Sequence, residues 1–408
     1  MKKQAKSKTP DTVKQEPFQP DTRRALDLAM KLMAIPGTSG QEGQVAEFIK
    51  AQLLGAGVPT SAIRIDSAHR RTPEPGDTGN LVLKLPGTTR RPRRMFSAHM
   101  DTVPVCVGSQ PVLDGDILRS ADPNAGLGAD NRAGVAVVLN TALELVENDL
   151  PHPPLAFCWF VQEETGLQGS RCVGKSLLGG PKMAFNWDGG SPAKLTIGAT
   201  GGYRLAIEVR GIASHAGGAP EHGVSAIAIA SLAIADLFRN GWHGDIHKGR
   251  NCGTSNVGVI QGGNATNVVT DRVLVKAEAR SHNSRFRERI VAEIEKAFRR
   301  AAREVKNVAG ATGAVTIDGR LDYEAFRLAP KEPCVEAAAS AVRSIGREPE
   351  LAIANGGLDA NWLFAHGIPT VSLGCGQLNQ HMISDSMDVA GFKDACQIAL
   401  RLATANEI

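Results

Sequence analysis

The sequence has no hydrophobic stretch long enough to cross a membrane. Its longest uninterrupted apolar run covers residues 155–161, whereas a helix that spans a bilayer needs roughly 20 apolar residues. The N-terminus is basic, but it lacks an apolar segment followed by a cleavage site of small residues, so no secretory signal is visible. We therefore expect a protein that is neither inserted into a membrane nor exported.

Paired cysteines and two common hydrolase motifs are also missing. The seven cysteines are odd in number and include no Cys-x-x-Cys pair, which is typical of reduced thiols in a cytoplasmic protein rather than of disulfides or cysteine-zinc sites. The sequence contains neither a His-Glu-x-x-His zinc motif nor a Gly-x-Ser-x-Gly serine nucleophile. No cysteine has an evident catalytic context, so a thiol mechanism has little support.

Most of the chain carries no net charge. Residues 1–24 carry seven basic and three acidic side chains, which accounts for the whole net charge of +4, and the other 384 residues balance. A neutral body argues against a nucleic-acid-binding surface. Residues 1–20 are rich in Lys, Thr and Pro, and we expect a disordered basic tail there that catalysis does not need.

What the chain does contain is an alternation of apolar strands and amphipathic helices. Before residue 200 we predict helices over 22–33, 41–54 and 132–146 and strands over 81–85, 95–98, 155–161 and 183–187. After Pro330 we predict helices over 334–345 and 389–403 with a strand over 370–373. Strands that alternate with helices favour an α/β fold whose mostly parallel sheet is covered by helices on both faces.

The pattern changes between residues 200 and 326. There we predict strands over 203–209, 255–260, 267–279 and 314–317 and helices over 224–238 and 286–305. That order, βαββαβ, is typical of a ferredoxin-like α+β module. We therefore expect one α/β domain, residues 21–199 and 327–408, that is interrupted by an inserted α+β domain, residues 200–326.

Acidic and histidine residues follow several of the predicted strands directly. Because ligands bind beyond the carboxyl ends of parallel strands, we expect these residues to meet at one edge of the sheet: His99, Asp101, Asp130, Glu163, Glu164, Asp188 and His381. Such a set can hold one or two zinc-like ions through nitrogen and oxygen ligands. Two ions need one carboxylate that touches both, and a further Glu can then accept a proton from water. Each residue alone also has an ordinary structural explanation, so the joint arrangement carries the prediction.

The segments that hold these residues resemble the M20 family of metallopeptidases, and within it the peptidase T-like tripeptidases. The resemblance covers nearly the whole chain after the tail, in order and spacing. It is found in residues 97–104 (SAHMDTVP), 128–134 (GADNRAG), 163–166 (EETG), 186–190 (NWDGG) and around His381.

The resemblance implies a hydrolase with two zinc ions per subunit, with Co²⁺ or Mn²⁺ as other possible metals. His99 and Asp188 would bind one ion, Glu164 and His381 the other, and Asp130 would bridge them. Asp101 would orient His99. Glu163 would be the general base that activates a bridging water and later protonates the leaving amine.

The resemblance also implies that residues 200–326 form a lid that can mediate a homodimer. His215 matches the family's lid histidine, which stabilises the oxyanion and in relatives often comes from the partner subunit. Asn267 and Arg280 match positions that contact the carboxylate end of the substrate, although Arg280 could also be a surface charge. Asn355 lies in a substrate loop where peptidase T has Arg, which leaves the peptide specificity open.

We therefore expect a cytoplasmic exopeptidase for short peptides, most simply a tripeptide aminopeptidase. An M20-type carboxypeptidase, an N-acyl amidohydrolase and a catalytically inactive peptide binder remain alternatives. A distant one is an ATP-binding protein, because residues 169–176 (GSRCVGKS) match the phosphate-binding pattern. Two carboxylates precede that stretch, which does not directly follow its strand, so nucleotide binding has little support.

Overall fold

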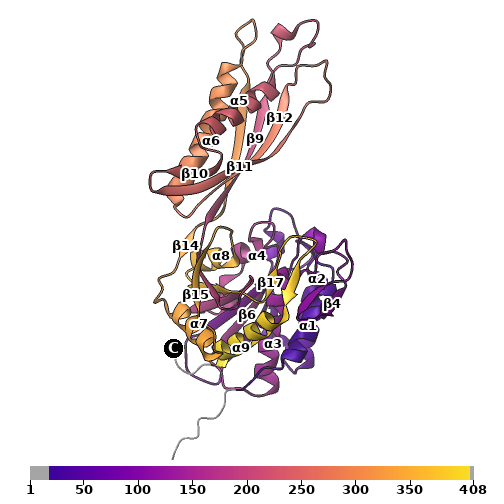
Figure 1. The fold of residues 1–408 in the computed structure, drawn as a ribbon, viewed down its shortest axis with the longest axis vertical. Helices are drawn as coiled ribbons and strands as arrows, with labels where there is room; N and C mark the ends of the chain where they lie inside the picture. The colour runs from indigo at the N-terminus through magenta and orange to yellow at the C-terminus, as the bar shows by residue number, and fades with distance from the viewer. Residues whose placement is uncertain (1–17, 405–408) are drawn as a thin grey trace, which may run out of the picture.

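The computed structural model describes residues 18–404, and its largest element is a nine-stranded sheet (Figure 1). The strand order is β1-β2-β6-β3-β7-β16-β8-β14, with β15 paired to β8. The four central strands β6, β3, β7 and β16 are parallel, and antiparallel pairs flank them. The strands are β1 Ile63–Ile65, β2 Leu81–Leu85, β3 Arg94–His99, β6 Leu155–Phe160, β7 Met183–Trp187, β8 Lys194–Ala199, β14 Phe326–Arg327, β15 Glu350–Ala354 and β16 Thr370–Leu373.

Helices cover both faces of this sheet. Successive residues of a strand point to opposite faces, so Phe96 belongs to one apolar cluster and its neighbour Met95 to another. The Phe96 face packs against α1 Thr22–Ala34, α2 Gly43–Gly55, α3 Ala129–Glu147, α7 Pro333–Ser344 and α9 Val389–Thr404. The opposite face packs against α8 Asp359–Ala365, which contacts α4 Gln168–Cys172. The predicted α/β fold with helices on both faces is confirmed.

The segment between β8 and β14 forms a second body, with its own sheet and core, that stands apart from the first in Figure 1. Its five antiparallel strands follow the order β10-β11-β12-β9-β13, and α5 and α6 pack together in its core. The elements are β9 Gly201–Arg210, α5 Ala226–Arg239, β10 Gly244–Lys248, β11 Asn251–Gly262, β12 Arg272–Ser281, α6 Ser284–Glu304 and β13 Ala314–Tyr323. Without β10, the strand order is that of a ferredoxin-like module.

A third, four-stranded sheet has the order β17-β18-β5-β4. It consists of β4 Pro111–Asp114, β5 Ile117–Ser120, β17 Gln377–Leu378 and β18 Ser386–Asp388. The loop between β17 and β18 carries His381. This sheet therefore holds one of the predicted site residues beside the main sheet.

The two bodies are joined by two adjacent chain segments. The side-chain amide of Asn361 donates hydrogen bonds to the carbonyls of Thr200 (3.0 Å) and Glu324 (2.7 Å), one in each segment. Arg287 of α6 pairs with the Glu324 carboxylate at 2.9 Å. The connection is therefore narrow but well bonded.

Several elements differ from the predicted ones. The sequence patterns missed two helices, five strands and the small third sheet; the missed helices and strands are α4, α8, β1, β8, β10, β14 and β15. They also placed the start of β12 at residue 267, five residues before its first residue, Arg272. Of the predicted disordered tail, residues 1–20, residues 1–17 lie outside the described part of the chain. Within residues 18–404, no helix is both long and apolar enough to cross a membrane.

Candidate metal centre

The carboxyl ends of the parallel strands bring the predicted metal ligands together. His99 is the last residue of β3, Glu163 and Glu164 follow β6, and Asp188 follows β7. Asp130 lies in the first turn of α3, and His381 comes from the loop after β17. Six residues that are up to 282 positions apart in the sequence thus share one edge of the sheet.

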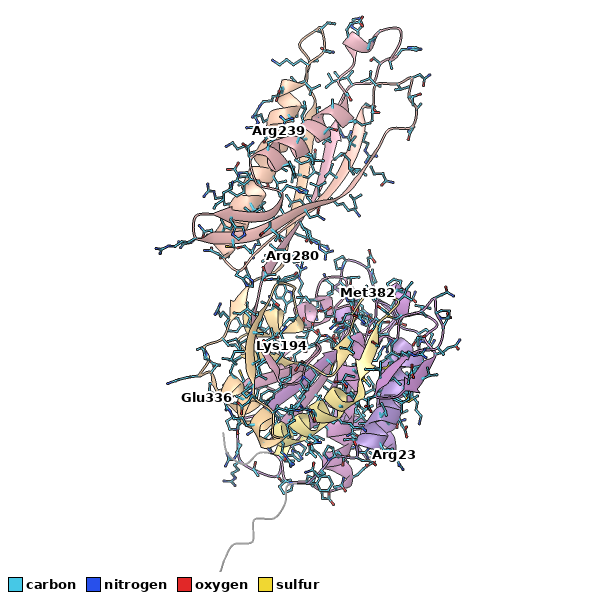
Figure 2. The ribbon with its side chains drawn as sticks, in the orientation of Figure 1. Arg23, Lys194, Arg239, Arg280, Glu336 and Met382 are labelled. Atoms are coloured by element: carbon cyan, nitrogen blue, oxygen red, sulfur yellow. The ribbon has the colours of Figure 1, made fainter. Side chains whose placement is uncertain are left out.

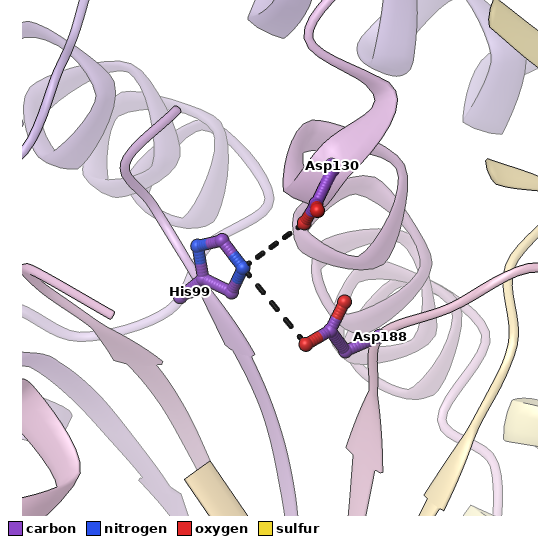
Figure 3. Close-up of side chains that lie close together, drawn as sticks. All are labelled: His99, Asp130 and Asp188. Carbon is purple, nitrogen blue, oxygen red and sulfur yellow. Dashed lines mark ion pairs between the residues drawn. The ribbon is translucent and has the colours of Figure 1, made fainter. Parts of the chain in front are cut away.

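His99 faces three carboxylates through one ring nitrogen, and Figure 3 shows two of them, Asp130 and Asp188. Its Nε2 lies 3.2 Å from Asp130 Oδ1, 4.0 Å from Asp188 Oδ2 and 4.0 Å from Glu163 Oε2. His99 is almost fully buried, at 1% exposure. A cation between these groups would be held by an imidazole nitrogen and carboxylate oxygens, which are zinc-type ligands.

His381 faces the other side of Asp130. Its Nε2 lies 3.2 Å from Asp130 Oδ2 and 2.9 Å from Glu164 Oε2. The two oxygens of Asp130 therefore point to different histidines, Oδ1 to His99 and Oδ2 to His381. A carboxylate in this position can touch two cations at once.

Asp101 connects His99 to the loop that follows β6. Its Oδ1 lies 3.2 Å from His99 Nδ1 and accepts the Glu163 N–H at 3.0 Å. Its Oδ2 accepts the Glu164 N–H at 3.1 Å and the hydroxyl of Ser39 at 2.6 Å. Since a carboxylate only accepts, Nδ1 of the neutral ring carries the proton and Nε2 remains available to a metal.

The electrostatics show that this cluster holds more negative charge than the protein neutralises. Burial raises the pKa of Asp188 to about 8, and the charge of Asp130 adds to the rise. Burial also raises the pKa of Glu163 well above its usual range. Burial lowers the pKa of His99, but the charge of Glu163 and the contact with Asp101 outweigh it and hold the pKa well above the ordinary value.

The residues fit a pair of divalent cations. The side chains of Asp130 and Glu164 raise the pKa of His381 to about 10, so the carboxylates draw protons to positions where a cation would supply the same positive charge. Asp130 Oδ1 is buried and accepts no hydrogen bond of acceptable geometry. Two overlapping groups of three residues each could hold an ion: His99, Asp130 and Asp188, and Asp130, Glu164 and His381. Within each group, the three ligand atoms lie within 4.8 Å of one another.

An open cavity of about 360 Å³ leads to the cluster. Asp130, Glu163, Glu164, Asp188 and His381 all line it. Lys194, at the start of β8, is the one Lys or Arg among its lining residues in the described part of the chain, and the sequence patterns did not single it out (Figure 2). Lys194 thus adds a positive charge to the wall of the cavity that leads to the carboxylates.

Two predicted substrate residues, His215 and Asn267, lie together but far from this cavity. The Ala216 N–H donates to the Asn267 carbonyl at 2.9 Å, and His215 pairs with Val268 in an isolated bridge. Both residues lie beyond the end of β12 that starts at Arg272, whereas Arg280 is near the other end, about 30 Å away for ten extended residues. Within one chain the structure therefore does not bring His215 and Asn267 to the metal ligands.

Arg280 and Asn355 lie where the two bodies meet (Figure 2 labels Arg280). Asn355 Oδ1 lies 3.0 Å from Nε2 of His282, which belongs to the second body. Arg280 makes a two-pronged pair with Glu278, with both N···O distances at 3.0 Å. Ala354 and Gly357, on either side of Asn355, line the cavity. This loop thus links the second body to the rim of the metal site.

Sequence reasoning missed three residues that support the cluster: Glu42 and Gln377, which are buried, and Ser39, which is half-buried. Ser39 bonds Asp101 across 62 positions, and Glu42 accepts the Gln162 N–H at 2.8 Å. Gln377 donates to Asn131 Oδ1 at 2.9 Å and lies 3.4 Å from Asp188 Oδ1. Ser39 and Glu42 follow no strand of the parallel core. Gln377 comes shortly after β16, but it is neither acidic nor a histidine, so the pattern of strand ends did not mark it.

Two backbone N–H groups at the start of the phosphate-binding pattern, residues 169–176, are already bonded within the chain. The Gly169 N–H donates to the Val161 carbonyl at 2.9 Å, and the Arg171 N–H donates to the Leu167 carbonyl at 3.0 Å. A Cβ on Gly169 would lie only 2.3 Å from the Val161 carbonyl oxygen. The glycine is therefore needed for close backbone packing, and the alternative of an ATP-binding protein is not supported.

Comparisons with known proteins agree with this site. Residues 95–405 match the model of peptidase family M20/M25/M40. An uncharacterised protein of Bacillus subtilis, YqjE, is 30% identical over 90% of this chain and 94% of its own length. A tripeptidase structure from Staphylococcus aureus superimposes with a TM-score of 0.84 at 27% identity, covering 95% of this chain and 99% of that one. The aminopeptidase PepT structure from Bacillus cereus gives a TM-score of 0.79 at 30% identity over 94% and 98% of the two chains. The chain therefore belongs to peptidase family M20/M25/M40 and is a metallopeptidase.

Proposed function

We propose that the protein is a zinc-dependent exopeptidase that hydrolyses short peptides, with tripeptides as preferred substrates and the N-terminal residue as the one released. The observation that carries the proposal is the position of Asp130, whose two oxygens each lie 3.2 Å from a different histidine. The similarity to a tripeptidase and to the aminopeptidase PepT supports the substrate class.

The chain's own residues divide into two ligand sets that share Asp130. His99 and Asp188 would hold one ion, and Glu164 and His381 the other. Zinc suits these nitrogen and oxygen donors, and Co²⁺ or Mn²⁺ could replace it. Two such ions, when bound, polarise the scissile carbonyl and lower the pKa of water.

Glu163 is the residue that we assign to proton transfer. Its carboxyl group lines the cavity beside the ligands, and its backbone is fixed by the bond to Asp101. From there it can take a proton from the attacking water and pass it to the leaving amine. Asp101 orients His99 and, through two N–H bonds, both neighbouring glutamates.

Peptide-end specificity can be tested directly with three tripeptides of the same sequence: one free, one N-acetylated and one C-amidated. An aminopeptidase is expected to cleave the free and amidated peptides and to reject the acetylated one, because it binds the free amine. Products read by mass spectrometry show which bond is cut. A carboxypeptidase would reject the amidated peptide, and an N-acyl amidohydrolase would release acetate. Either result contradicts the aminopeptidase proposal while leaving the metal site in place.

Because His215 lies far from the metal ligands of its own chain, we infer that it acts in the active site of a second copy of the chain. Its Nδ1 accepts the N–H groups of Gly217 (3.1 Å) and Gly218 (2.9 Å), so the neutral ring carries its proton on Nε2. That proton can stabilise an oxyanion. We therefore propose a homodimer in which the 200–326 segments meet and each His215 and Asn267 reaches the other copy's cavity.

Complementation between two inactive variants tests this dimer. Glu163→Gln and His215→Ala, each nearly inactive alone, are expected to regain about a quarter of wild-type activity when co-expressed in equal amounts. Half of the dimers are then mixed, and each mixed dimer has one site with both residues intact. Recovery of no activity in a purified mixed dimer contradicts action in trans. The control is a purified mixed dimer of a wild-type chain with a chain that carries both changes. Action in trans leaves this dimer no site with both residues intact, so it should be nearly inactive.

The cysteines support the cytoplasmic location that we propose. All seven are free thiols, five of them buried. An oxidising compartment would favour paired cysteines.

A further inference from the structure

Asp385 connects the loop that carries His381 to the loop that leads to Asp130. It follows His381 by four residues and is 2% exposed. Its Oδ2 accepts the backbone N–H groups of Gly128 at 2.6 Å and Ala129 at 3.0 Å. Its own carbonyl accepts the N–H of Leu127 at 3.3 Å. Three consecutive N–H groups directly before Asp130 are thus bonded to one residue of the His381 loop.

The start of α3 requires an acceptor from outside the helix. Its N-cap residue is Gly128, at a φ of 81°, which has no side chain to accept the free N–H groups of the first turn. Asp130 lies in that turn, but its oxygens face the two histidines. The Asp385 carboxylate fills the role for Gly128 and Ala129. These two residues lie directly before Asp130 and Asn131, whose backbone is not helical and separates them from the regular part of α3.

The two loops also touch through their backbones. A Cβ on Gly126 would lie 2.6 Å from the Met382 carbonyl oxygen and 3.3 Å from the Asp385 Cβ. The buried thiol of Cys106 donates to the same oxygen, Oδ2 of Asp385, at 3.7 Å. Met382 itself lies on the surface of the first body (Figure 2). The two loops therefore meet at Asp385, beneath the exposed part of the His381 loop.

We propose that Asp385 is a positioning residue for the metal centre. It holds the loop of Asp130 and the loop of His381 together, so that the Asp130 carboxylate stays at the right distance from His381. The proposal rests on the dinuclear function proposed above. It assigns Asp385 no contact with metal or substrate. Its effect on catalysis passes through the N–H groups of Leu127, Gly128 and Ala129.

The test compares Asp385→Ala and Asp385→Asn with a matched control, Asp388→Ala, in the full-length protein. Asp388 lies three residues further on and also bonds two backbone N–H groups, those of Ala390 and Gly391 at 3.1 Å, at the start of α9. Among the described residues, its side chain forms no hydrogen bond with the loop of Asp130 or the loop of His381. Co²⁺ is titrated into each metal-free protein while its visible absorption is recorded, and kcat and KM are measured separately on a tripeptide.

Asp385→Ala is expected to weaken binding of the second Co²⁺ by about 10- to 100-fold, the effect usual for loss of a residue that orients a ligand. Its cobalt absorption should shift, and kcat should fall while KM changes by less than about threefold. Asp385→Asn keeps an accepting oxygen but loses the charge, so a loss of about three- to tenfold is expected. Asp388→Ala should match the wild type in cobalt binding.

Three outcomes overturn the proposal. If wild-type protein binds no Co²⁺ pair, the dinuclear function and the role of Asp385 both fail. If it binds two ions and the Asp385 variants bind them equally well, with an unchanged spectrum, only the role of Asp385 fails. If Asp385→Ala does not fold, Asp385→Asn decides alone, and wild-type affinity and kcat in that variant count against the proposal.

Discussion

Replacing Glu163 by Gln is expected to lower kcat by about 10²- to 10⁴-fold, the usual contribution of a general acid–base residue. The amide has the size of the carboxyl group but cannot accept a proton from water. The other site carboxylates and both histidines remain, and the backbone bond from residue 163 to Asp101 does not involve the changed atoms. Metal content, measured by mass spectrometry of the purified protein, should therefore stay at the wild-type value.

The neighbouring change Glu164→Gln is the matched control for this result. Glu164 has the same size, lies in the same loop and bonds the same Asp101 carboxylate through its N–H. Its side chain, however, lies 2.9 Å from His381 Nε2, so Glu164→Gln should lose metal as well as turnover. If Glu163→Gln keeps wild-type turnover with both metals bound, or if it loses metal like Glu164→Gln, its assignment as the general base is wrong.

The central strands could be predicted from the sequence almost to the residue. The predicted bounds of 81–85, 183–187 and 370–373 are those of β2, β7 and β16. These strands are buried on both faces, so each is a short, nearly continuous apolar run with polar or glycine residues at its ends. The ligands follow such strands directly, which is why a pattern of strand ends also indicated the metal residues.

The missed elements lack that signal because neighbouring chain segments, not their own composition, stabilise them. In β10 only Ile246 is fully buried, and the rest of the strand is polar or exposed. Its pairing with β11 across a tight turn makes it a strand. Likewise β15 is exposed or half-buried throughout and is held by parallel pairing with β8.

The supporting residues of the site could not be predicted from the sequence for the same reason. Ser39 and Glu42 precede and begin α2, where a polar residue is ordinarily a cap or a surface group. Their contacts with Asp101 and Gln162 exist only because the first loop folds over the end of β6. The separation of His215 from Arg280 could not be predicted either, since it depends on the length and direction of β9 and β12.

Replacing Asp130 by Ala is expected to remove both metals and reduce turnover at least as much as Glu163→Gln. No other carboxylate of the cluster lies within 3.2 Å of both histidines. Loss of a residue that merely orients a ligand weakens metal binding by about 10- to 100-fold, so loss of a shared ligand should exceed the upper value. Calorimetric titration of Zn²⁺ into the metal-free variant measures both stoichiometry and affinity.

Asp122→Ala is a suitable control, because Asp122 lies in the segment between β5 and Asp130 and its side chain bonds only the nearby Asn124 among the described residues. The Asp122→Ala variant should bind two ions with wild-type affinity, which would show that an Asp→Ala change in this segment is not harmful by itself.

Two ions bound with wild-type affinity by Asp130→Ala would contradict a bridging role. One ion lost and one retained at full affinity would place Asp130 in a single site. Glu164→Gln and Asp188→Asn, added in turn to Asp130→Ala, would then identify the retained ion, because only the change that removes one of its ligands abolishes the remaining binding.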